Sequence, residues 1–450
     1  MNSDKYDIAV IGSGPGGFTA AVRSSQFGAR VVLIEKSFMG GTCLNCGCIP
    51  TKFLWQALKM KQKIQKSYEY GFKTFLEPIV FADIVAKKDK NISSIRKGMD
   101  LVLKSHDVTV VSGAASFKDK NTLRVLNDGN STNIFADKII IAVGTDPLII
   151  KNLEFDRVKI IDSTDVLNLQ KIPKNMLIIG GGVIGIEMAT IFAGFGCHIT
   201  LAERENKLLP NEDNEISEEI KKNLLRQDVE VLTECTNALD NLDNMDKYEK
   251  VLIATGRTPK GDLNLEKANI KITKNGFIET DEFCQTSTSN IYAVGDIAGK
   301  TLLAYTAQNE GAIAAENGVK GNSIKIDNSV VPQVVFAMPQ SSSVKVSNFL
   351  NYKDIIFGKF SLTASSRAFI ENERLGFVKC AVDKVTKRPL AFWIIGAHCD
   401  ELVNTASQIL KNGIKLSRET MFHPSFGESL FNAYEDAFGM CTEITRKKVK

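Results

Sequence analysis

The chain is poor in several features that would point to particular functions. Its 450 residues include only four histidines, so we expect no multi-histidine metal site and predict no bound metal. The 56 lysines and arginines nearly balance 52 acidic residues, and a net charge of +4 does not indicate nucleic acid or an anionic membrane as a partner. The longest apolar stretch, residues 176–186, is shorter than the ~20 residues that a membrane span needs.

The cysteines do not form the framework of a small secreted protein. There are nine of them, an odd number, and six occur singly along the chain. A strand-like pattern begins by Asp7, so we expect no secretory signal. We therefore expect a cytoplasmic protein, or one of an organellar matrix if a presequence has been removed.

The first part of the chain carries two copies of one pattern: a strand, a glycine turn, a helix, and a second strand that ends in an acid. The glycines and acids are Gly12, Gly14, Gly17 and Glu35 in the first copy, and Gly180, Gly182, Gly185 and Glu203 in the second. The acid follows the first glycine by 23 residues in both copies. Later apolar strands end similarly, at Gly144 and Gly256. An internal duplication of a nucleotide-binding unit explains this repeat.

Each glycine of such a turn has a physical role. The first permits the tight turn, the second lets the backbone approach a pyrophosphate, and the third lets helix and strand pack closely. The phosphates then face the N–H groups at the helix N-terminus, and the acid accepts hydrogen bonds from ribose hydroxyls. Glu203 would repel a 2′-phosphate, which favours NAD(H) over NADP(H), although the neighbouring Arg204 weakens that preference.

The periodicity of apolar residues predicts further elements. In the first copy we expect a helix over 18–27, a strand over 31–34, a helix around 53–65, short antiparallel strands over 108–111 and 122–125, and a strand over 138–143. In the second copy we expect strands over 198–202 and 251–254 and an amphipathic helix over 215–225. A polar stretch at 316–330 is a candidate boundary. Strands over 334–336, 355–360, 377–382 and 390–395 then precede helices over 401–410 and 428–438, which indicates an α+β domain.

Three cysteines lie within six residues, at Cys43, Cys46 and Cys48. Cys43 and Cys46 have the spacing of thioredoxin-like redox pairs. In an ideal helix Cys43 and Cys48 would lie about 8.7 Å apart between Cα atoms, whereas a disulfide tolerates about 4.4–6.8 Å. That pair needs a distorted segment, which Asn45 and Gly47 could supply. A metal site is a third option, but no second ligand cluster matches it.

The segment from His423 to Glu428 holds the best acid–base candidates. A histidine held by a carboxylate can take a thiol proton near neutral pH. Pro424 would fix the local turn and aim the imidazole ring.

These features together resemble the FAD-dependent pyridine nucleotide–disulfide oxidoreductases, and among them most closely the dihydrolipoamide dehydrogenases. The matching segments are GGTCLNCGCIPTK, GGGVIGIE, ATGRTP, IYAVGDIAG and HPSFGE. The resemblance implies an α/β fold with two Rossmann-like dinucleotide-binding domains, for FAD and for NAD, and a C-terminal α+β dimerisation domain. It implies an FAD-binding domain with the redox disulfide over 1–148, an NAD-binding domain over 149–275, a further FAD-binding segment over 276–330 and a dimerisation domain over 331–450.

The resemblance also implies roles for single residues. Cys43 and Cys48 would form the redox disulfide, with Cys43 exchanging thiols and Cys48 facing the flavin, while His423 and Glu428 would be the base and its orienting acid, acting across a homodimer. The implied FAD-binding residues are Gly12, Gly14, Gly17, Glu35, Lys36, Gly41, Thr42, Lys52, Ala115, Gly144, Asp296 and Ala304. The implied NAD-binding residues are Gly180, Gly182, Gly185, Glu187, Glu203 and Gly256, with Glu187 at the position that pairs with Lys52. The implied substrate is dihydrolipoamide, free or on the lipoyl domain of a 2-oxo-acid dehydrogenase complex.

The sequence departs from the family pattern at several points. Cys46 lies where the family usually has another residue, Tyr305 where it often has histidine, Gln340 where it has glutamate, and Lys345 where it has glycine. The stretch between Glu203 and Ala254 is also short for the family's nicotinamide domain.

Two alternative functions are considered. One is an NAD(P)H-dependent reductase of another disulfide, such as a glutathione-like one, or of mercuric ion. Glu203 argues against the first, and the lack of a vicinal cysteine pair at the tail argues against the second. The other alternative is a flavoprotein sensor without turnover, which the retained cysteine pair and His423 make less favourable.

Overall fold

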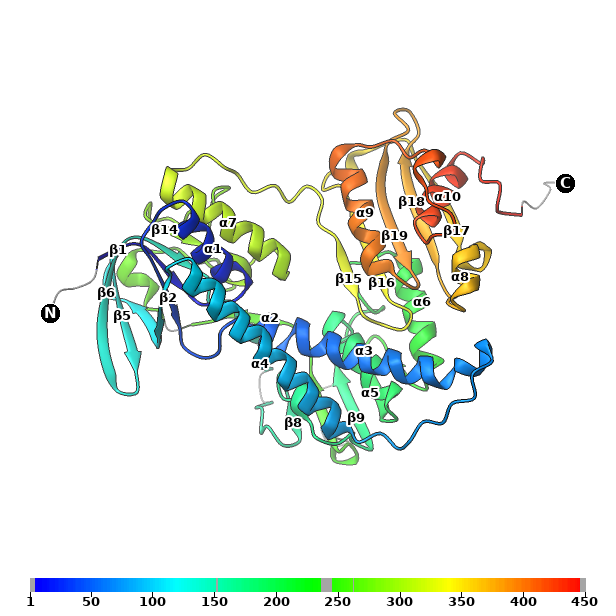
Figure 1. Ribbon diagram of the computed structural model, residues 1–450, viewed down its shortest axis with the longest axis horizontal. Helices are drawn as coiled ribbons and strands as arrows, with labels where there is room; N and C mark the ends of the chain where they lie inside the picture. Colours follow the sequence, from blue (N-terminus) through cyan, green and yellow to red (C-terminus); the bar gives the residue numbers. More distant parts are fainter. Residues whose placement is uncertain (1–4, 151–152, 236–244, 262, 446–450) are drawn as a thin grey trace. The chain divides into compact units, whose positions relative to one another are not determined.

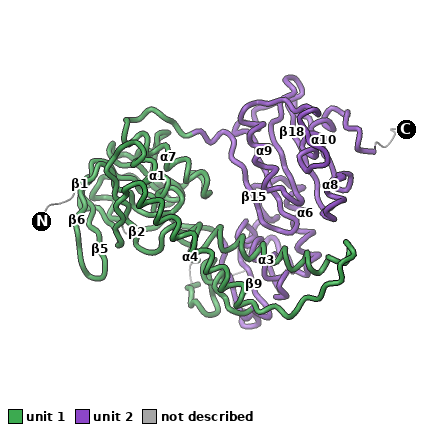
Figure 2. Tube along the Cα trace, viewed as in Figure 1, with its two compact units in different colours: residues 1–171, 256–326 green, residues 172–255, 327–450 purple. Residues whose placement is uncertain are grey.

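The computed structural model describes residues 5–150, 153–235, 245–261 and 263–445. The chain divides into two compact units (Figure 2). Unit 1 comprises residues 1–171 and 256–326, and unit 2 comprises residues 172–255 and 327–450. The chain passes from unit 1 to unit 2 for the last time after Ile326, inside the polar stretch at 316–330. The first residues of that stretch, 316–320, still belong to a helix.

Unit 1 is built on a mixed sheet with the order β3-β2-β1-β6-β5-β4, in which β14 also pairs with β6 (Figure 1). The strands are β1 (Lys5–Ile11), β2 (Val31–Glu35), β3 (Thr109–Ser112), β4 (Ala114–Phe117), β5 (Thr122–Asn127), β6 (Asn130–Ile141) and β14 (Ile291–Ala293). β1 is parallel to β2 and to the second half of β6, whereas β4, β5 and the first half of β6 form an antiparallel meander. The interior of the sheet is strongly apolar, as a strand covered on both faces requires.

Five α-helices accompany this sheet in the described part of unit 1: α1 (Pro15–Gln26), α2 (Gly41–Cys46), α3 (Cys48–Gln65), α4 (Phe81–Ser105) and α7 (Ala304–Lys320). Helix α1 starts three residues earlier than predicted because Pro15 is well placed in a first helical turn. Two short strands, β7 (Thr145–Pro147) and β13 (Arg257–Pro259), pair antiparallel, and β8 covers only Ile160–Ile161.

One predicted pairing is wrong. The strand expected over 108–111 is β3, and it lies parallel to β2, with Leu33 opposite Val110. The sequence analysis missed the 25-residue helix α4, which precedes β3. A helix that connects two strands carries the chain back to the end of the sheet where the first strand began. The next strand therefore runs parallel to the first. The strand over 122–125 is antiparallel, as expected.

Unit 2 contains the second nucleotide-binding fold. Its strands β9 (Asn175–Ile179), β10 (His198–Ala202), β11 (Glu230–Leu232) and β12 (Lys250–Ile253) are parallel, in the order β11-β10-β9-β12. Helices α5 (Val183–Gly194) and α6 (Asn214–Leu225) follow β9 and β10. The stretch between Glu203 and Ala254 that is short in sequence includes residues 236–244, which lie outside the described residues.

The remainder of unit 2 is an antiparallel sheet with the order β15-β16-β19-β18-β17. Its strands are β15 (Gln333–Val335), β16 (Ser341–Lys345), β17 (Ile355–Ser361), β18 (Phe377–Asp383) and β19 (Pro389–Ile395). Helix α9 (Cys399–Asn412) packs on β16 and β19, helix α10 (Glu428–Ala437) packs on β17 and β18, and α8 (Ser366–Ile370) is a short helix after β17 (Figure 1). The α/β fold with a C-terminal α+β domain is therefore confirmed. No described helix is long and apolar enough to cross a membrane.

Candidate active site

The first glycine turn joins β1 to α1 and combines close packing with an open face. Gly12 has φ +97°, and a Cβ there would lie 2.6 Å from the carbonyl oxygen of Ala142. A Cβ on Gly17 would lie 1.9 Å from the oxygen of Gly12. A Cβ on Gly14, by contrast, would meet no atom within 4 Å. The outer glycines are needed for packing, and the middle one leaves space for a group that approaches the backbone.

The second glycine turn, between β9 and α5, repeats this arrangement. Gly180 has φ +114°, and its Cβ would lie 2.5 Å from the oxygen of Ala254. A Cβ on Gly185 would lie 1.9 Å from the oxygen of Gly180, and one on Gly182 would meet nothing within 4 Å. The same three steric requirements thus recur at matching positions, which is the geometry that a pyrophosphate cradle needs. The residues of both turns fit a dinucleotide.

The acid at the end of the second strand of each copy closes the glycine turn. The Glu35 Oε2 accepts hydrogen bonds from the Ser13 N–H at 2.8 Å and the Ser13 hydroxyl at 2.6 Å. The Glu203 Oε2 accepts one from the Gly181 N–H at 2.6 Å. Each carboxylate oxygen can accept more than one hydrogen bond, so both acids remain able to bind ribose hydroxyls. Lys36, next to Glu35, is exposed.

Arg204, the neighbour of Glu203, forms an exposed ion pair with an adjacent acid. Its guanidinium group is bound by the neighbouring Glu205, with Nη2 donating to Oε1 at 3.0 Å. Glu203 itself is 9% exposed and anchored to the glycine turn. The Glu203 carboxylate is therefore the better fixed of these two charges.

The cysteine helix α2 starts against the first glycine turn. The Gly40 N–H donates to the Ser13 hydroxyl at 3.1 Å. A Cβ on Gly41, which has φ +58°, would lie 2.7 Å from the Cα of Gly14. Thr42 and Cys43 follow directly. The backbone of α2 is thus held beside the open face of the turn, which places the cysteine cluster next to the candidate cofactor cradle.

The helix breaks between the cysteines at Gly47. This glycine has φ −145° and ψ −111°, so α2 ends at Cys46 and α3 begins at Cys48. Asn45, two residues before the break, is tied to the start of α2, because its Nδ2 donates to the carbonyl oxygens of Met39 at 3.0 Å and Gly41 at 2.8 Å. Arg96 of α4 donates to the Asn45 Oδ1 at 2.6 Å. This is the distorted segment that a Cys43–Cys48 pair requires.

The break brings the Cys43 and Cys48 thiols into contact. A hydrogen bond with Cys48 raises the pKa of Cys43 above that of an ordinary cysteine; burial raises it further, and the nearby Lys52 ammonium lowers it. Cys46 does not contribute to this shift. Among the described residues no three Cys, His, Asp or Glu side chains are grouped as metal ligands.

A second polar cluster of unit 1 surrounds Asp296. The Thr145 hydroxyl donates to the Asp296 Oδ2 at 3.0 Å, and Arg257 donates to the Thr145 hydroxyl at 2.7 Å and to its carbonyl oxygen at 2.6 Å. Burial raises the pKa of Asp296, while Thr145 and Arg257 lower it. Gly144 precedes Thr145 with φ +74°, and Gly256 precedes Arg257 with φ +134°.

Sequence reasoning missed Thr145 and Arg257. Each of these residues directly follows a glycine at the end of an apolar strand, Gly144 or Gly256. This repeated position in the sequence could have identified them as candidates. It also missed Glu310 on α7, which is 1% exposed and accepts a hydrogen bond from the Gly295 N–H at 2.7 Å. Burial raises the pKa of Glu310.

Other predicted site residues lie apart from these contacts. Ala115 is buried in β4, opposite Val125. Ala304 is the first residue of α7 and precedes Tyr305, whose pKa burial raises to about 12. Glu187 lies in α5 of unit 2, is 4% exposed, and accepts a hydrogen bond from the Phe336 N–H at 3.1 Å. Gln340 is also buried in unit 2, whereas Lys345 is exposed.

His423 and Glu428 meet in unit 2, at the start of α10. The His423 Nδ1 lies 2.9 Å from the Glu428 Oε1, and the Glu428 Oε2 accepts a hydrogen bond from the Ser425 N–H at 2.8 Å. The His423 side chain is 68% exposed and that of Glu428 is 16% exposed. With Nδ1 held by the carboxylate, Nε2 is the ring nitrogen left to act as a base. The structure thus gathers the glycines, Glu35 and cysteines in unit 1, and the second glycine turn and the His–Glu pair in unit 2.

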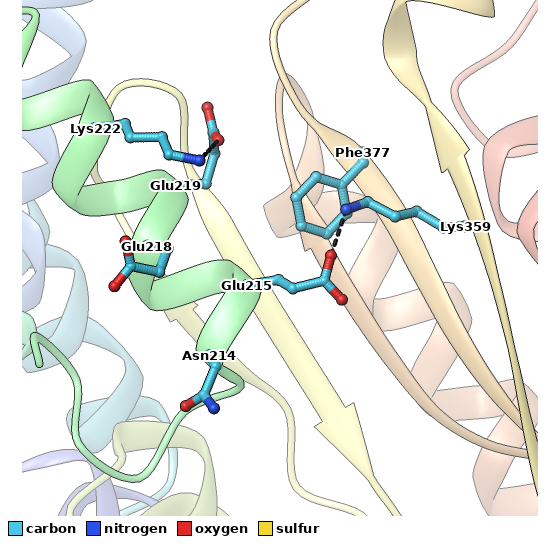
Figure 3. A pocket seen from close by; sticks show the side chains of 7 residues that line it. All are labelled: Asn214, Glu215, Glu218, Glu219, Lys222, Lys359 and Phe377. Carbon is cyan, nitrogen blue, oxygen red and sulfur yellow. Dashed lines mark hydrogen bonds and ion pairs between the residues drawn. The ribbon is translucent and has the colours of Figure 1, made fainter.

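Unit 2 also contains a surface pocket (Figure 3). It is lined by Asn214, Glu215, Glu218, Glu219, Lys222, Lys359 and Phe377. Lys359 reaches over the Phe377 ring to pair with Glu215, and Lys222 pairs with Glu219 at 3.7 Å. These charges largely neutralise one another, and the pocket includes no predicted site residue.

Comparison with known proteins agrees with this geometry. Residues 6–311 match the family described as pyridine nucleotide-disulphide oxidoreductase, and residues 331–434 match its dimerisation domain. The chain is 35% identical to a dihydrolipoyl dehydrogenase of Geobacillus stearothermophilus over 98% of each chain. It is 34% identical to one of Chlamydia trachomatis over 95% of each.

A solved structure, the flavoprotein disulfide reductase RclA from Escherichia coli in a Cu(II) complex, is 28% identical to the chain with a TM-score of 0.85. The match covers 96% of this chain and 99% of the RclA chain. The chain therefore belongs to the pyridine nucleotide-disulphide oxidoreductase family and is an enzyme that uses FAD and NAD(H).

Proposed function

We propose that this enzyme is a dihydrolipoyl dehydrogenase, which oxidises dihydrolipoamide with NAD⁺ through a Cys43–Cys48 disulfide. The observation that carries the proposal is the hydrogen-bonded Cys43–Cys48 pair, held beside the first glycine turn by Gly41. Several full-length relatives carry this name, at 32–35% identity. The natural substrate would be a lipoyl group of a 2-oxo-acid dehydrogenase complex. The odd number of cysteines, six of which occur singly along the chain, favours a reducing compartment such as the cytoplasm.

The two cofactors are assigned to the two glycine turns. We assign FAD to the first turn, with Glu35 on its ribose, and NAD to the second, with Glu203 on its ribose. In this assignment residues 1–148 and 276–330 hold FAD, residues 149–275 hold NAD, and residues 331–450 form the dimer. Lys36, Gly41, Thr42, Lys52, Ala115, Gly144, Asp296 and Ala304 would complete the FAD site, and Gly256 and Glu187 the NAD site.

The chemistry of the chain's own residues is thiol–disulfide exchange. A dihydrolipoamide thiolate attacks the Cys43 sulfur of the oxidised pair, and the bond between Cys43 and Cys48 breaks, leaving Cys48 as a thiolate. The second substrate thiolate attacks the substrate sulfur that is bound to Cys43, which releases lipoamide and the Cys43 thiolate. FAD, which the first glycine turn and Glu35 would hold, would supply the two-electron redox chemistry that links the reduced cysteine pair to NAD⁺. The hydrogen bond with Cys48 raises the pKa of Cys43, so the reduced pair holds one proton between its two sulfurs, which comes from the base that took it from the substrate thiol.

His423 supplies the base for this exchange. The imidazole Nε2 takes the proton of the attacking thiol, and Glu428 holds the ring and stabilises the charge that it gains. We assign the base to His423 of the partner subunit, because the family's dimerisation domain matches residues 331–434. A second copy of the chain would then complete each site.

Substituting the middle glycine of each turn tests the cofactor assignment. Gly14 has φ −61° and Gly182 has φ −79°, so the backbone at both positions tolerates a side chain. A Cβ at either position would meet no protein atom within 4 Å, so we expect a valine side chain to extend into the open face. We expect Gly14→Val to fold but to lose the visible absorbance of flavin, and Gly182→Val to keep the flavin while its KM for NADH rises about tenfold or more. Each variant is the control for the other, because only Gly14→Val should lose flavin and only Gly182→Val should keep flavin with a raised KM for NADH. Loss of flavin in both variants would contradict the assignment.

The substrate is tested by steady-state turnover with NADH or NADPH and three acceptors: lipoamide, glutathione disulfide and Hg²⁺. We expect lipoamide to be reduced fastest, and NADH to be preferred over NADPH by about 100-fold because Glu203 would face the 2′-phosphate. Faster reduction of glutathione disulfide or Hg²⁺ would replace the proposed substrate. Equal use of NADPH would contradict the role given to Glu203.

A further inference from the structure

The structure contains a second histidine–glutamate pair, which packs against the HPSFGE segment. The His398 Nε2 lies 2.9 Å from the Glu371 Oε2. The His398 ring also lies against the ring of Phe426, with centroids 4.9 Å apart and an interplanar angle of 41°. Phe426 is 7% exposed and lies between His423 and Glu428 in sequence. The pair therefore contacts the one buried aromatic ring of the segment that carries the proposed base.

The Glu371 side of this contact is firmly held. The Arg367 guanidinium group donates to the Glu371 Oε1 through Nε at 2.7 Å and pairs with it through Nη2 at 2.6 Å. Burial raises the pKa of Glu371, but hydrogen bonds from His398 and Arg367 outweigh it and hold the pKa below its usual range. Glu371 is thus ionised at neutral pH and fixes the plane of the His398 ring.

The backbone of His398 is fixed as well. His398 has φ +59° and precedes α9, and its carbonyl oxygen accepts hydrogen bonds from the N–H groups of Glu401 at 3.1 Å and Leu402 at 2.9 Å. A side chain that is constrained at its backbone, at Nε2 and at its ring face has little freedom to rotate. The His398 side chain is 42% exposed, and its ring is held against Phe426.

Phe426 transmits this constraint to the base. Its carbonyl oxygen accepts the Ser429 N–H at 3.0 Å at the start of α10. On its N-terminal side, the Ser425 N–H donates to the Glu428 Oε2, whose other oxygen contacts His423. Movement of the Phe426 ring would thus displace the hydrogen bond that orients Glu428, and with it the His423 imidazole.

We propose that His398 is a positioning residue for thiol exchange: with Glu371 it holds Phe426, and Phe426 holds the His423–Glu428 pair in place. The proposal rests on the function proposed for His423. Displacing a catalytic group by about 1 Å can cost up to about 100-fold in rate. The loss is expected in kcat rather than KM, because His398 would act on the base and not on the bound substrate.

The test uses the full-length, FAD-loaded enzyme and follows each half-reaction by rapid mixing. We expect His398→Ala and His398→Gln to slow the reduction of the oxidised enzyme by dihydrolipoamide about tenfold or more, while reduction by NADH stays within about twofold. The glutamine variant keeps a polar partner for Glu371 but lacks the ring, so it separates ring packing from the hydrogen bond. The control is His198→Ala, which removes an exposed imidazole on β10 of the same unit. Glu371→Gln should also slow exchange, and Glu373→Gln should not.

A double substitution decides whether Phe426 transmits the effect. If it does, Phe426→Leu combined with His398→Ala should slow exchange little more than either change alone. The proposal is overturned if the rate losses of the two single variants multiply in the double variant. It is also overturned if His398→Ala leaves the exchange rate unchanged, or if it slows the NADH half-reaction equally. The same variants are compared with dithiothreitol as reductant. If wild-type enzyme reacts with dithiothreitol but not with dihydrolipoamide, the proposed substrate is wrong, and the dithiothreitol rates still decide the role of His398.

Discussion

Cys48→Ser should reduce the oxidation of dihydrolipoamide by NAD⁺ on the order of 10³-fold or more. Serine cannot form the disulfide that Cys43 must break to accept the substrate sulfur, so no electron pair leaves the substrate. The first exchange step then has no leaving thiolate. Cys48 is the first residue of α3 and is only partly buried, so the substitution changes one atom of its side chain and should leave folding and flavin binding intact.

Cys46→Ser is the matched control for that experiment. Cys46 ends α2, does not contribute to the pKa shift of Cys43, and belongs to no metal-binding group in the described part of the chain. We expect it to keep turnover within about twofold of wild type. Turnover with lipoamide and titration of accessible thiols before and after NADH reduction measure both variants. Equal loss of turnover in the two variants would instead favour a Cys43–Cys46 pair.

The local motifs of this protein were predictable because each depends on neighbours in the sequence. The glycine turns, with Glu35 and Glu203, follow from steric needs that recur at a fixed spacing, and the structure places Ser13 and Gly181 on these acids as that spacing requires. The contact between Cys43 and Cys48 needed a distorted helix, and Gly47 supplies it. His423 and Glu428 are five residues apart, so a short turn was enough to join them.

Features that depend on distant segments were not predictable. Helix α4 carries many charged residues and only a narrow apolar stripe, so its pattern is weak, and missing it led to the wrong pairing for β3. Strand β16 is a serine-rich segment that pairs with β15 and β19, and its burial comes from that pairing rather than from its own hydrophobicity. The contact of His398 with Phe426 joins α9 to the HPSFGE segment, and no spacing in the sequence indicates it.

His423→Gln should slow thiol exchange about 10²- to 10⁴-fold, the usual contribution of a positioned base. Glutamine is polar and of similar length, and it can still hydrogen-bond to Glu428, so the turn before α10 should remain folded. It cannot take up the thiol proton, and the substrate must then react through the small fraction that is already thiolate. The loss should therefore shrink as pH rises toward the pKa of the substrate thiol, because the thiolate becomes abundant without a base.

The measurement compares lipoamide turnover of the His423→Gln variant and wild type across this pH range, with flavin content and reduction by NADH as internal controls. His198→Gln is the matched variant, since His198 is an exposed histidine of the same unit with no place in the proposed mechanism.

Mixing His423→Gln with Cys48→Ser subunits adds a test of the dimer. If the base comes from the partner subunit, each mixed dimer carries one intact site, with wild-type Cys48 from one chain and wild-type His423 from the other, and activity should return to about a quarter of wild type when the subunits exchange at random. If His423→Gln leaves turnover unchanged, His423 is not the base. If mixing the two variants restores no activity, the base and the disulfide belong to the same chain.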